Sequence, residues 1–143
     1  MTCYQNQPLR AKHCRKCDHC VATHDHHCPW LGNCVGERNK RFFYAYLWAQ
    51  QFLIALICLL ATRLLILRRH KVIAWITVGF GLAFSLFVIN LIVFHSCLLL
   101  RNITTWEFLS WQKVSYLKEW PRKFGSPFDL GIGMNLRLVF RYD

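Results

Sequence analysis

Two long apolar blocks dominate the sequence and restrict what the chain can fold into. Residues 42–67 contain one arginine and a few polar side chains, and residues 72–100 contain no charged residue. Each block exceeds the roughly 20 residues that cross a bilayer as a helix. A chain of 143 residues is too short to bury two such helices inside a soluble core. We therefore expect an α-helical integral membrane protein.

The link between the blocks, residues 68–71, is so short that the two spans should form a helical hairpin. Both ends of the chain then lie on one side of the membrane. Most of the Lys and Arg residues lie in the segments that flank the hairpin, before residue 42 and after residue 100. This bias predicts that both ends face the cytosol. Clustered cysteines agree, because thiols stay reduced there and can bind metal.

The formal net charge of +11 raises the alternative of a zinc-finger protein that binds nucleic acid. That alternative leaves both apolar blocks unexplained. The positive residues flank the blocks and form no continuous basic stripe. We expect no nucleic acid as a partner, and favour an anionic lipid surface or an acidic, nucleotide-bearing small molecule.

Residues 1–41 hold six of the eight cysteines and five of the seven histidines. Zinc takes four nitrogen or sulfur ligands in structural sites, and a small segment without an apolar core needs such a staple to fold. A disulfide framework would suit a secreted domain and conflicts with the predicted orientation. We therefore predict zinc binding in this segment.

The cluster contains more Cys and His side chains than two zinc ions would use. Asp25-His26-His27-Cys28 places a carboxylate, an imidazole and a thiol next to one another. These groups could serve as the orienting acid, the base and the nucleophile of covalent catalysis. Spacing alone leaves open which histidine binds metal and which acts as the base.

The spacing of these residues resembles the cysteine-rich domain of the DHHC-type palmitoyltransferases. The matching pattern runs Cys3-x9-His13-Cys14-x2-Cys17-x2-Cys20-x4-Asp25-His26-His27-Cys28-x5-Cys34, and Thr104-Thr105-Trp106-Glu107 matches the TTxE motif of that family. The family pattern has one further cysteine, which would precede Met1, and two further spans with a DPG motif upstream. The sequence is therefore expected to correspond to the carboxy-terminal portion of such a protein.

The resemblance implies a role for each residue of the cluster. Cys28 would be the nucleophile that becomes acylated, His26 its base and Asp25 the residue that orients the base. Two structural Zn²⁺ sites would lie in a small domain rich in loops and β-hairpins. The expected ligands are Cys14, Cys17, His27 and Cys34 for one ion, and Cys3, His13 and Cys20 for the other, whose fourth ligand would precede Met1.

The resemblance also implies an enzyme, a protein-cysteine S-palmitoyltransferase. It would move a fatty acyl group from acyl-CoA to substrate proteins through an acyl-enzyme on Cys28. The expected partners are membrane lipid, fatty acyl-CoA and proteins with juxtamembrane or cytosolic cysteines. The expected location is the Golgi or endoplasmic reticulum membrane, as a multi-pass protein with the cysteine-rich domain facing the cytosol. A membrane adaptor, whose zinc domain only binds partners, is the alternative.

Arg10 and Lys12 lie in the zinc-binding segment and are candidates for contacting the phosphates of acyl-CoA; the alternative is solvated surface charge. Thr104-x-x-Glu107 is typical of a capping box that begins a helix. We expect that helix to run through Trp111 towards Leu117 with its apolar side chains at the membrane surface.

The expected organisation has five parts. They are the zinc domain (1–41), a span (42–67), a short loop (68–71), a second span (72–100) and a cytosolic carboxy-terminal region (101–143). The resemblance also implies that Asn135, in the last part, corresponds to a structurally important asparagine of the family.

Overall fold

The computed structural model describes residues 7–140 and divides into two compact units. Unit 1 comprises Met1–Phe43 together with His95–Asp143, and unit 2 comprises Tyr44–Phe94. Two segments that are distant in the sequence therefore build unit 1 together, and they include the start of the first long helix and the end of the second. Those predicted site residues that fall within residues 7–140 all lie in unit 1.

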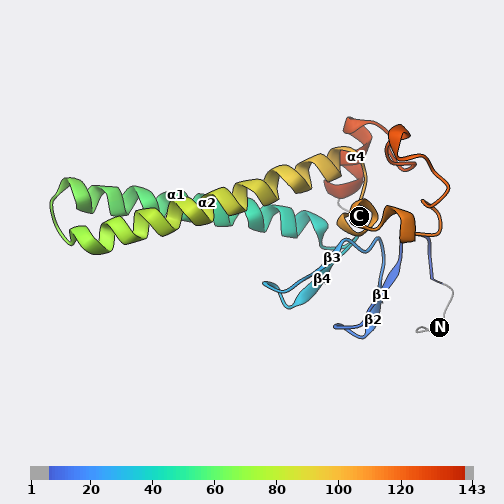
Figure 1. Ribbon diagram of the computed structural model, residues 1–143, viewed down its shortest axis with the longest axis horizontal. Coiled ribbons are helices and arrows are strands. Elements are labelled where there is room, and N and C mark those ends of the chain that lie inside the picture. Colours follow the sequence, from blue (N-terminus) through green and yellow to red (C-terminus); the bar gives the residue numbers. More distant parts are fainter. Residues whose placement is uncertain (1–6, 141–143) are drawn as a thin grey trace. The chain divides into compact units, whose positions relative to one another are not determined.

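Two small antiparallel β-hairpins form the first part of unit 1 (Figure 1). Strand β1 (Lys12–Cys14) pairs with β2 (His19–Val21), and β3 (His26–Cys28) pairs with β4 (Asn33–Val35). Each connecting turn contains a residue with positive φ, Asp18 at 52° and Gly32 at 59°. Such residues suit tight hairpin turns because Gly, Asn and Asp tolerate this backbone region. The expected domain rich in β-hairpins is confirmed.

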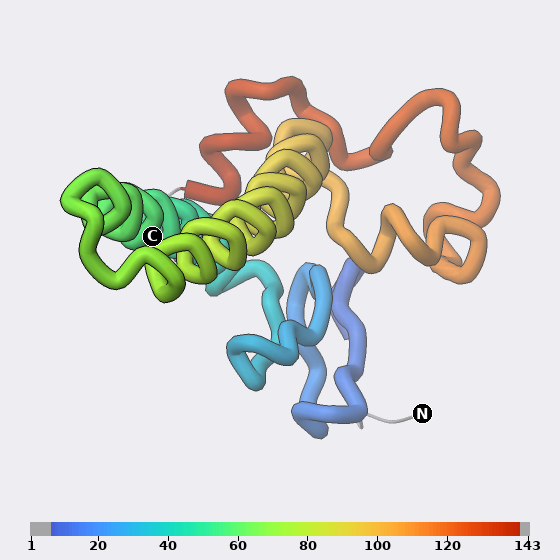
Figure 2. The backbone as a smooth tube through the Cα atoms, turned by 60° about the vertical axis from the view of Figure 1, so that its left-hand side comes forward, coloured from blue at the N-terminus to red at the C-terminus, as the bar shows by residue number. Residues whose placement is uncertain are grey.

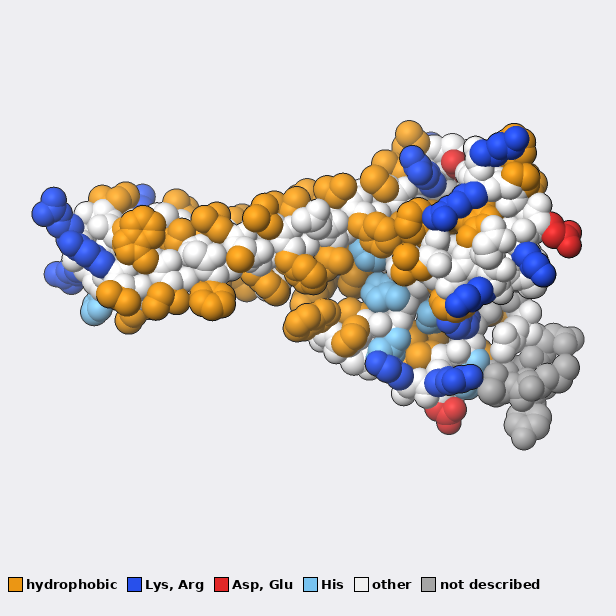
Figure 3. All heavy atoms as spheres, in the orientation of Figure 1, with side chains coloured by type: hydrophobic (Ala, Val, Ile, Leu, Met, Phe, Trp, Pro, Cys, Tyr) orange, Lys and Arg blue, Asp and Glu red, His pale blue; other side chains and the backbone are white. Residues whose placement is uncertain are grey.

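The long helices α1 (Lys40–Ile66) and α2 (Lys71–Leu100) follow. Within unit 2 they run antiparallel beside each other (Figure 2), and apolar side chains cover their surface (Figure 3). Both are long and apolar enough to cross a membrane, and only 11% of each most apolar window is buried. Lys and Arg side chains gather at the tip of the hairpin (Figure 3). The expected helical hairpin is confirmed.

Polar and small side chains set the contact between the two helices of unit 2. Gln51 Nε2 donates a hydrogen bond of 2.7 Å to Ser85 Oγ. A side chain at Gly81 would collide with Cys58 Sγ. The helices therefore approach closely where a glycine faces a small thiol, as is common between membrane helices.

Short helices follow α2 in unit 1: α3 (Thr105–Leu109), η1 (Trp111–Lys113), η2 (Arg122–Phe124) and α4 (Ile132–Phe140). The capping box at the start of α3 is confirmed. Glu107 N donates to Thr104 Oγ1 over 3.2 Å, and Thr104 N donates to Glu107 Oε2 over 2.8 Å. These bonds satisfy two backbone groups that a helix start leaves open.

The prediction that this helix continues to Leu117 is wrong. Helix α3 ends at Leu109, and Trp111 and Leu117 are buried instead of lying at a membrane surface. Trp111 Nε1 donates a 3.0 Å hydrogen bond to the Trp120 carbonyl. The chain folds back on itself here because burial of two large apolar side chains outweighs local helix propensity.

Asn135 of α4 attaches that helix to the end of α2. Its side chain is buried and donates to the Leu100 carbonyl over 2.8 Å and to Asp129 Oδ1 over 2.7 Å. Leu130 N donates to Asn135 Oδ1 over 3.0 Å. The Leu100 carbonyl belongs to the last turn of α2, where carbonyls lack partners within the helix. Asn135 thus has the structural role that was expected.

Candidate functional site

The register of the β3–β4 hairpin separates the two adjacent histidines of the cluster. His27 lies opposite Cys34, whereas its neighbours His26 and Cys28 lie opposite Val35 and Asn33. Side chains alternate between the two faces of a strand, and directly paired residues share a face. His27 and Cys34 therefore point to one face of the hairpin, and His26 and Cys28 to the other.

The face of His27 carries a group that could hold a metal ion. His27 Nδ1 lies 3.3 Å from Cys17 Sγ and 3.7 Å from both Cys14 Sγ and Cys34 Sγ. All four ligand atoms lie within 4.8 Å of one another. Tetrahedral zinc with ordinary bond lengths separates its nitrogen and sulfur ligands by about 3.6 Å. The donor set and spacing fit zinc, and these are the four residues predicted to share one ion.

The second predicted set is described only in part. His13 lies opposite Cys20 in the β1–β2 hairpin, and His13 Nδ1 is 3.9 Å from Cys20 Sγ. Cys3 lies outside the described residues. A second metal site on these three residues stays a prediction.

Asp25 is the most heavily engaged side chain near the opposite face. It is 1% exposed and contacts His26 Nδ1 at 2.8 Å, Thr105 Oγ1 at 2.6 Å and Lys40 Nζ at 3.1 Å. Burial alone would raise the pKa of Asp25, but the His26 hydrogen bond, the Lys40 charge and the Thr105 hydrogen bond hold it well below its usual range. Asp25 therefore remains a carboxylate at neutral pH.

The His26 ring is held from three directions. Its Nδ1 is hydrogen-bonded to Asp25, and the ring packs edge-on against Phe43 with centroids 5.1 Å apart. The ring of His95 lies 5.5 Å away in a tilted arrangement. With Nδ1 occupied, Nε2 is the nitrogen left for proton transfer, and Cys28 lies on the same face of the strand. A carboxylate, an imidazole and a thiol in this order can activate a nucleophile.

The Arg10 side chain is only 12% exposed, which contradicts the alternative of solvated surface charge, whereas its contact with acyl-CoA phosphates stays a prediction. Its guanidinium forms a bidentate ion pair with Glu107: Nε donates to Oε1 over 2.7 Å, and Nη2 donates to Oε2 over 2.8 Å. Its Nη1 donates to Asn102 Oδ1 over 3.0 Å. Tyr116 also donates to Glu107 over 3.0 Å. Burial would raise the pKa of Glu107, but the bonds from Arg10 hold it below its usual value. Arg10 thus links the first segment of unit 1 to α3.

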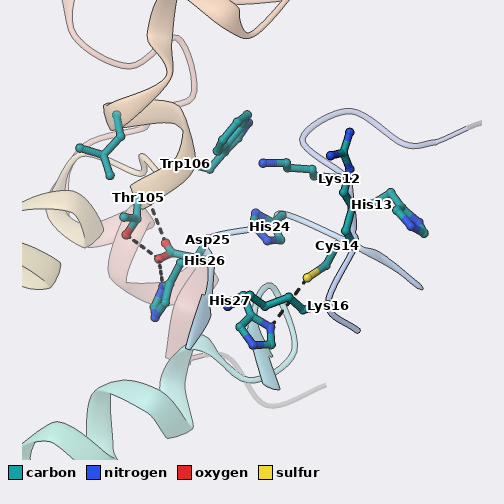
Figure 4. A pocket seen from close by; sticks show the side chains of 12 residues that line it. Lys12, His13, Cys14, Lys16, His24, Asp25, His26, His27, Thr105 and Trp106 are labelled. Carbon is teal, nitrogen blue, oxygen red and sulfur yellow. Dashed lines mark hydrogen bonds and ion pairs between the residues drawn. The ribbon is translucent and has the colours of Figure 1, made fainter. Parts of the chain in front are cut away.

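Lys12 lines an open cavity of about 620 Å³ beside the site (Figure 4). Its ammonium group stands over the Trp106 ring. The wall also includes the buried His24, whose pKa is lowered by burial and by the charge of Lys12. The lining residues come from β1, β3, the adjoining loops and α3: Lys12, His13, Cys14, Arg15, Lys16, His24, Asp25, His26, His27, Thr105, Trp106 and Leu109.

Three side chains near the site carried no predicted catalytic or binding role. Lys40 and Thr105 both contact Asp25, yet they lie 15 and 80 positions from it in the sequence. The motif around Thr105 indicated that this segment is important for the family, but it did not indicate that Thr105 contacts Asp25. The third side chain is His24, and the only sequence signal for it is its position directly before Asp25-His26-His27-Cys28.

Comparison with known proteins gives a consistent result. Residues 1–112 match the family model described as DHHC palmitoyltransferase. The chain is 37% identical to palmitoyltransferase ZDHHC12 of Homo sapiens over 96% of its own length and 53% of that protein, and 41% identical to the Mus musculus protein of the same name over the same shares. It is 40% identical to palmitoyltransferase ZDHHC18 of Rattus norvegicus over 74% of its own length and 30% of that protein. The chain thus spans about a third to a half of the relatives that it matches.

Proposed function

The chain belongs to the DHHC palmitoyltransferase family, and from this premise we propose that it is a protein S-palmitoyltransferase. It would transfer a fatty acyl group from acyl-CoA to cysteine side chains of substrate proteins. One observation carries the proposal: the register of β3 points Cys28 and His26 to one face, while Asp25 holds Nδ1 of His26 at 2.8 Å.

The proposed reaction has two acyl transfers. In the first, Nε2 of His26 takes the proton of the Cys28 thiol, and the thiolate attacks the carbonyl carbon of the acyl-CoA thioester. The carbon–sulfur bond to CoA breaks, the new thioester forms on Cys28, and the CoA sulfur leaves with the proton. In the second, a substrate thiol gives its proton to His26, and its thiolate attacks the acyl carbon of the Cys28 thioester. The bond from this carbon to Cys28 Sγ breaks, and the Cys28 sulfur leaves and takes the proton back from His26.

Asp25 would act through His26 and would not touch the acyl group. Its carboxylate fixes the ring orientation and stabilises the imidazolium that forms when Nε2 takes a proton. Thr105 and Lys40 in turn fix Asp25, with contacts of 2.6 Å and 3.1 Å. This chain of contacts supports a positioned base, the property that covalent catalysis by a thiol requires.

Cys14, Cys17, His27 and Cys34 would hold Zn²⁺, which would supply structural stability to the two hairpins and take no part in acyl transfer. The two hairpins contribute two ligands each. We infer a second ion on Cys3, His13 and Cys20 from the family resemblance.

The chain is a membrane protein with two apolar helices. A palmitoyl tail carries about fourteen methylenes, and moving it into water would cost on the order of 11 kcal/mol. An enzyme that keeps the tail in the bilayer avoids this cost. We infer that unit 1 faces the cytosol, where acyl-CoA and reduced cysteines occur, and that the protein resides in the Golgi or endoplasmic reticulum membrane.

The test uses membranes that contain the chain and a labelled acyl-CoA analogue. We expect a label on the protein that hydroxylamine releases and that disappears in Cys28→Ser. Cys97→Ser, at an exposed position of α2, is the matched control and should keep the label. A label that persists in Cys28→Ser would overturn the proposal.

A further inference from the structure

His24 is a buried histidine that the proposed reaction does not use. It lies between β2 and β3, and only 6% of the residue is exposed. Among the described residues, none forms a hydrogen bond with its ring nitrogen Nδ1, which is itself buried. A buried polar atom without a partner destabilises a fold. Such an atom therefore indicates a partner that residues 7–140 do not supply.

The His24 ring lines the 620 Å³ cavity (Figure 4). Lys12, Arg15 and Lys16 also line this cavity, so three positive side chains share its wall with His24. An imidazole can present an N–H at Nδ1 whether it is neutral or charged. A donor beside several cations suits an anionic oxygen, above all that of a phosphate.

The proposed base of the reaction, His26, also lines this cavity. Asp25 and His26 line it together with His24. A phosphate bound at His24 would therefore belong to a molecule that also reaches His26. Acyl-CoA carries phosphates and a thioester in one molecule, whereas a phospholipid headgroup has no group for His26 to act on.

We propose that His24 is a phosphate-recognising residue, whose Nδ1–H donates to a phosphate oxygen of acyl-CoA while Lys12 and Lys16 supply positive charge around it. This inference rests on the proposed function. The sequence did not predict a phosphate contact for His24. The proposed phosphate site does not include Arg10, because the Arg10 guanidinium is already paired with Glu107.

The first experiment compares two acyl donors with the membrane-embedded chain. One is palmitoyl-CoA and the other is palmitoyl-pantetheine, a thioester without phosphate. We expect His24→Leu to raise the KM for palmitoyl-CoA about tenfold, the loss of one hydrogen bond to a charged group, with kcat little changed. The KM of His24→Leu for palmitoyl-pantetheine should stay equal to that of the wild type. An equal rise for both donors, or none for palmitoyl-CoA, would overturn the phosphate contact.

The second experiment uses the shape of the side chain. The amide nitrogen of Asn can stand near the place of Nδ1, whereas that of Gln reaches towards Nε2. His24→Asn should therefore keep more affinity for palmitoyl-CoA than His24→Gln. His70→Asn, at the exposed hairpin tip, is the control outside unit 1. A better affinity in His24→Gln than in His24→Asn would contradict the assignment of Nδ1.

Thermal unfolding without donor separates recognition from a structural role. Removing an unpartnered buried nitrogen should raise the unfolding midpoint of His24→Leu, whereas loss of a structural hydrogen bond would lower it. A lowered midpoint with unchanged KM would overturn the proposal.

A further experiment adds vesicles that contain phosphoinositide and measures whether they compete with palmitoyl-CoA. Competition by the vesicles, together with an unaltered KM for palmitoyl-CoA in His24→Leu, would assign the site to a lipid headgroup instead. Absence of any Cys28 label with either donor in the wild type would overturn the proposed function itself.

Discussion

Unit 1 buries several polar and charged side chains, whereas unit 2 exposes many large apolar ones. At the centre of unit 1, Asp25, Glu107 and Asn135 are each 1% exposed, and each forms several hydrogen bonds. In unit 2, large apolar side chains such as Phe52 and Phe80 are more than 70% exposed. A polar interior in one unit thus contrasts with an apolar exterior in the other.

The difference follows from the solvent and from the task of each unit. Lipid solvates apolar side chains, and a membrane helix needs only to satisfy its own backbone hydrogen bonds. Unit 1 buries polar side chains next to apolar ones such as Val35, Trp111 and Leu117, so directional contacts must position those polar groups. The same directionality places His26 relative to Asp25. Substitutions of polar residues should therefore be severe in unit 1 and mild in unit 2.

The largest effect is expected from removal of one metal ligand in unit 1. Cys17→Ser and Cys34→Ser should each release one zinc and unfold the two hairpins, because structural zinc contributes about 10–16 kcal/mol to folding in small zinc domains. Metal analysis and limited proteolysis measure both effects. Cys58→Ser in unit 2 is the matched substitution and should retain all zinc. If Cys58→Ser lost as much zinc as Cys17→Ser, the predicted difference between the two units would be refuted.

The next effect concerns the buried ion pair of Arg10 and Glu107. Glu107→Gln should destabilise unit 1 by about 3–5 kcal/mol, because it leaves the Arg10 charge without its counterion. Unfolding followed by tryptophan fluorescence measures this change. Glu119→Gln, at an exposed position, should change stability by less than about 0.5 kcal/mol. Similar losses in both variants would refute a special role for the pair.

The same pair predicts how stability depends on acid. The pKa of Glu107 is lower in the folded protein than its ordinary value, so the unfolded state takes up a proton first as pH falls. The stabilisation from Glu107 is then complete above the ordinary Glu pKa of about 4.3 and declines as pH falls through the lowered pKa. Glu107→Gln should flatten this part of the profile of unfolding midpoint against pH, and an unchanged profile would contradict the assignment.

A smaller effect is expected at Thr105. Thr105→Val removes the hydroxyl that donates to Asp25 Oδ2 over 2.6 Å and should cost about 1.5–3 kcal/mol, the range for hydrogen bonds to charged groups. Acylation of Cys28 should slow as well, because Asp25 positions His26. Thr77→Val in unit 2 is the matched variant, since Thr77 bonds only to a carbonyl of its own helix. It should leave both measurements nearly unchanged, and comparable losses would remove the distinction between the units.

The smallest effect is expected at the interhelical hydrogen bond of unit 2. Gln51→Leu should cost about 0.6 kcal/mol, the average for such bonds between membrane helices. The yield of folded protein in membranes and the Cys28 label should both remain close to those of the wild type. A loss as large as that of Glu107→Gln would show that unit 2, too, depends on polar contacts.

Local sequence patterns predicted those parts of the fold that depend on neighbours in sequence. The apolar blocks gave both long helices, with α1 beginning at Lys40 and α2 ending at Leu100, because hydropathy is a property of each segment alone. The capping box at Thr104 is local in the same sense. The end of α3 was missed because burial of Trp111 depends on a turn nine residues further along.

Contacts across the chain were beyond the reach of spacing. Arg10 and Glu107 are 97 positions apart, and no local pattern pairs them. Spacing did not separate the roles of His26 and His27; the family resemblance implied different roles, and the strand register points the two imidazoles to opposite faces. His24 was passed over because a missing hydrogen-bond partner becomes visible only when all surrounding groups have been placed.

The alternation along β3 also bears on how the protein is made. A slip of the β3–β4 pairing by one residue exchanges the two faces of a hairpin and could set Cys28 opposite Cys34 in place of His27. Thiols bind zinc readily, so such a hairpin could capture the metal with its nucleophile and be folded but inert. Zinc bound by His27 instead would stabilise the productive pairing. For a newly synthesised chain, metal loading would then act as a proofreading step that decides whether the reactive thiol is free.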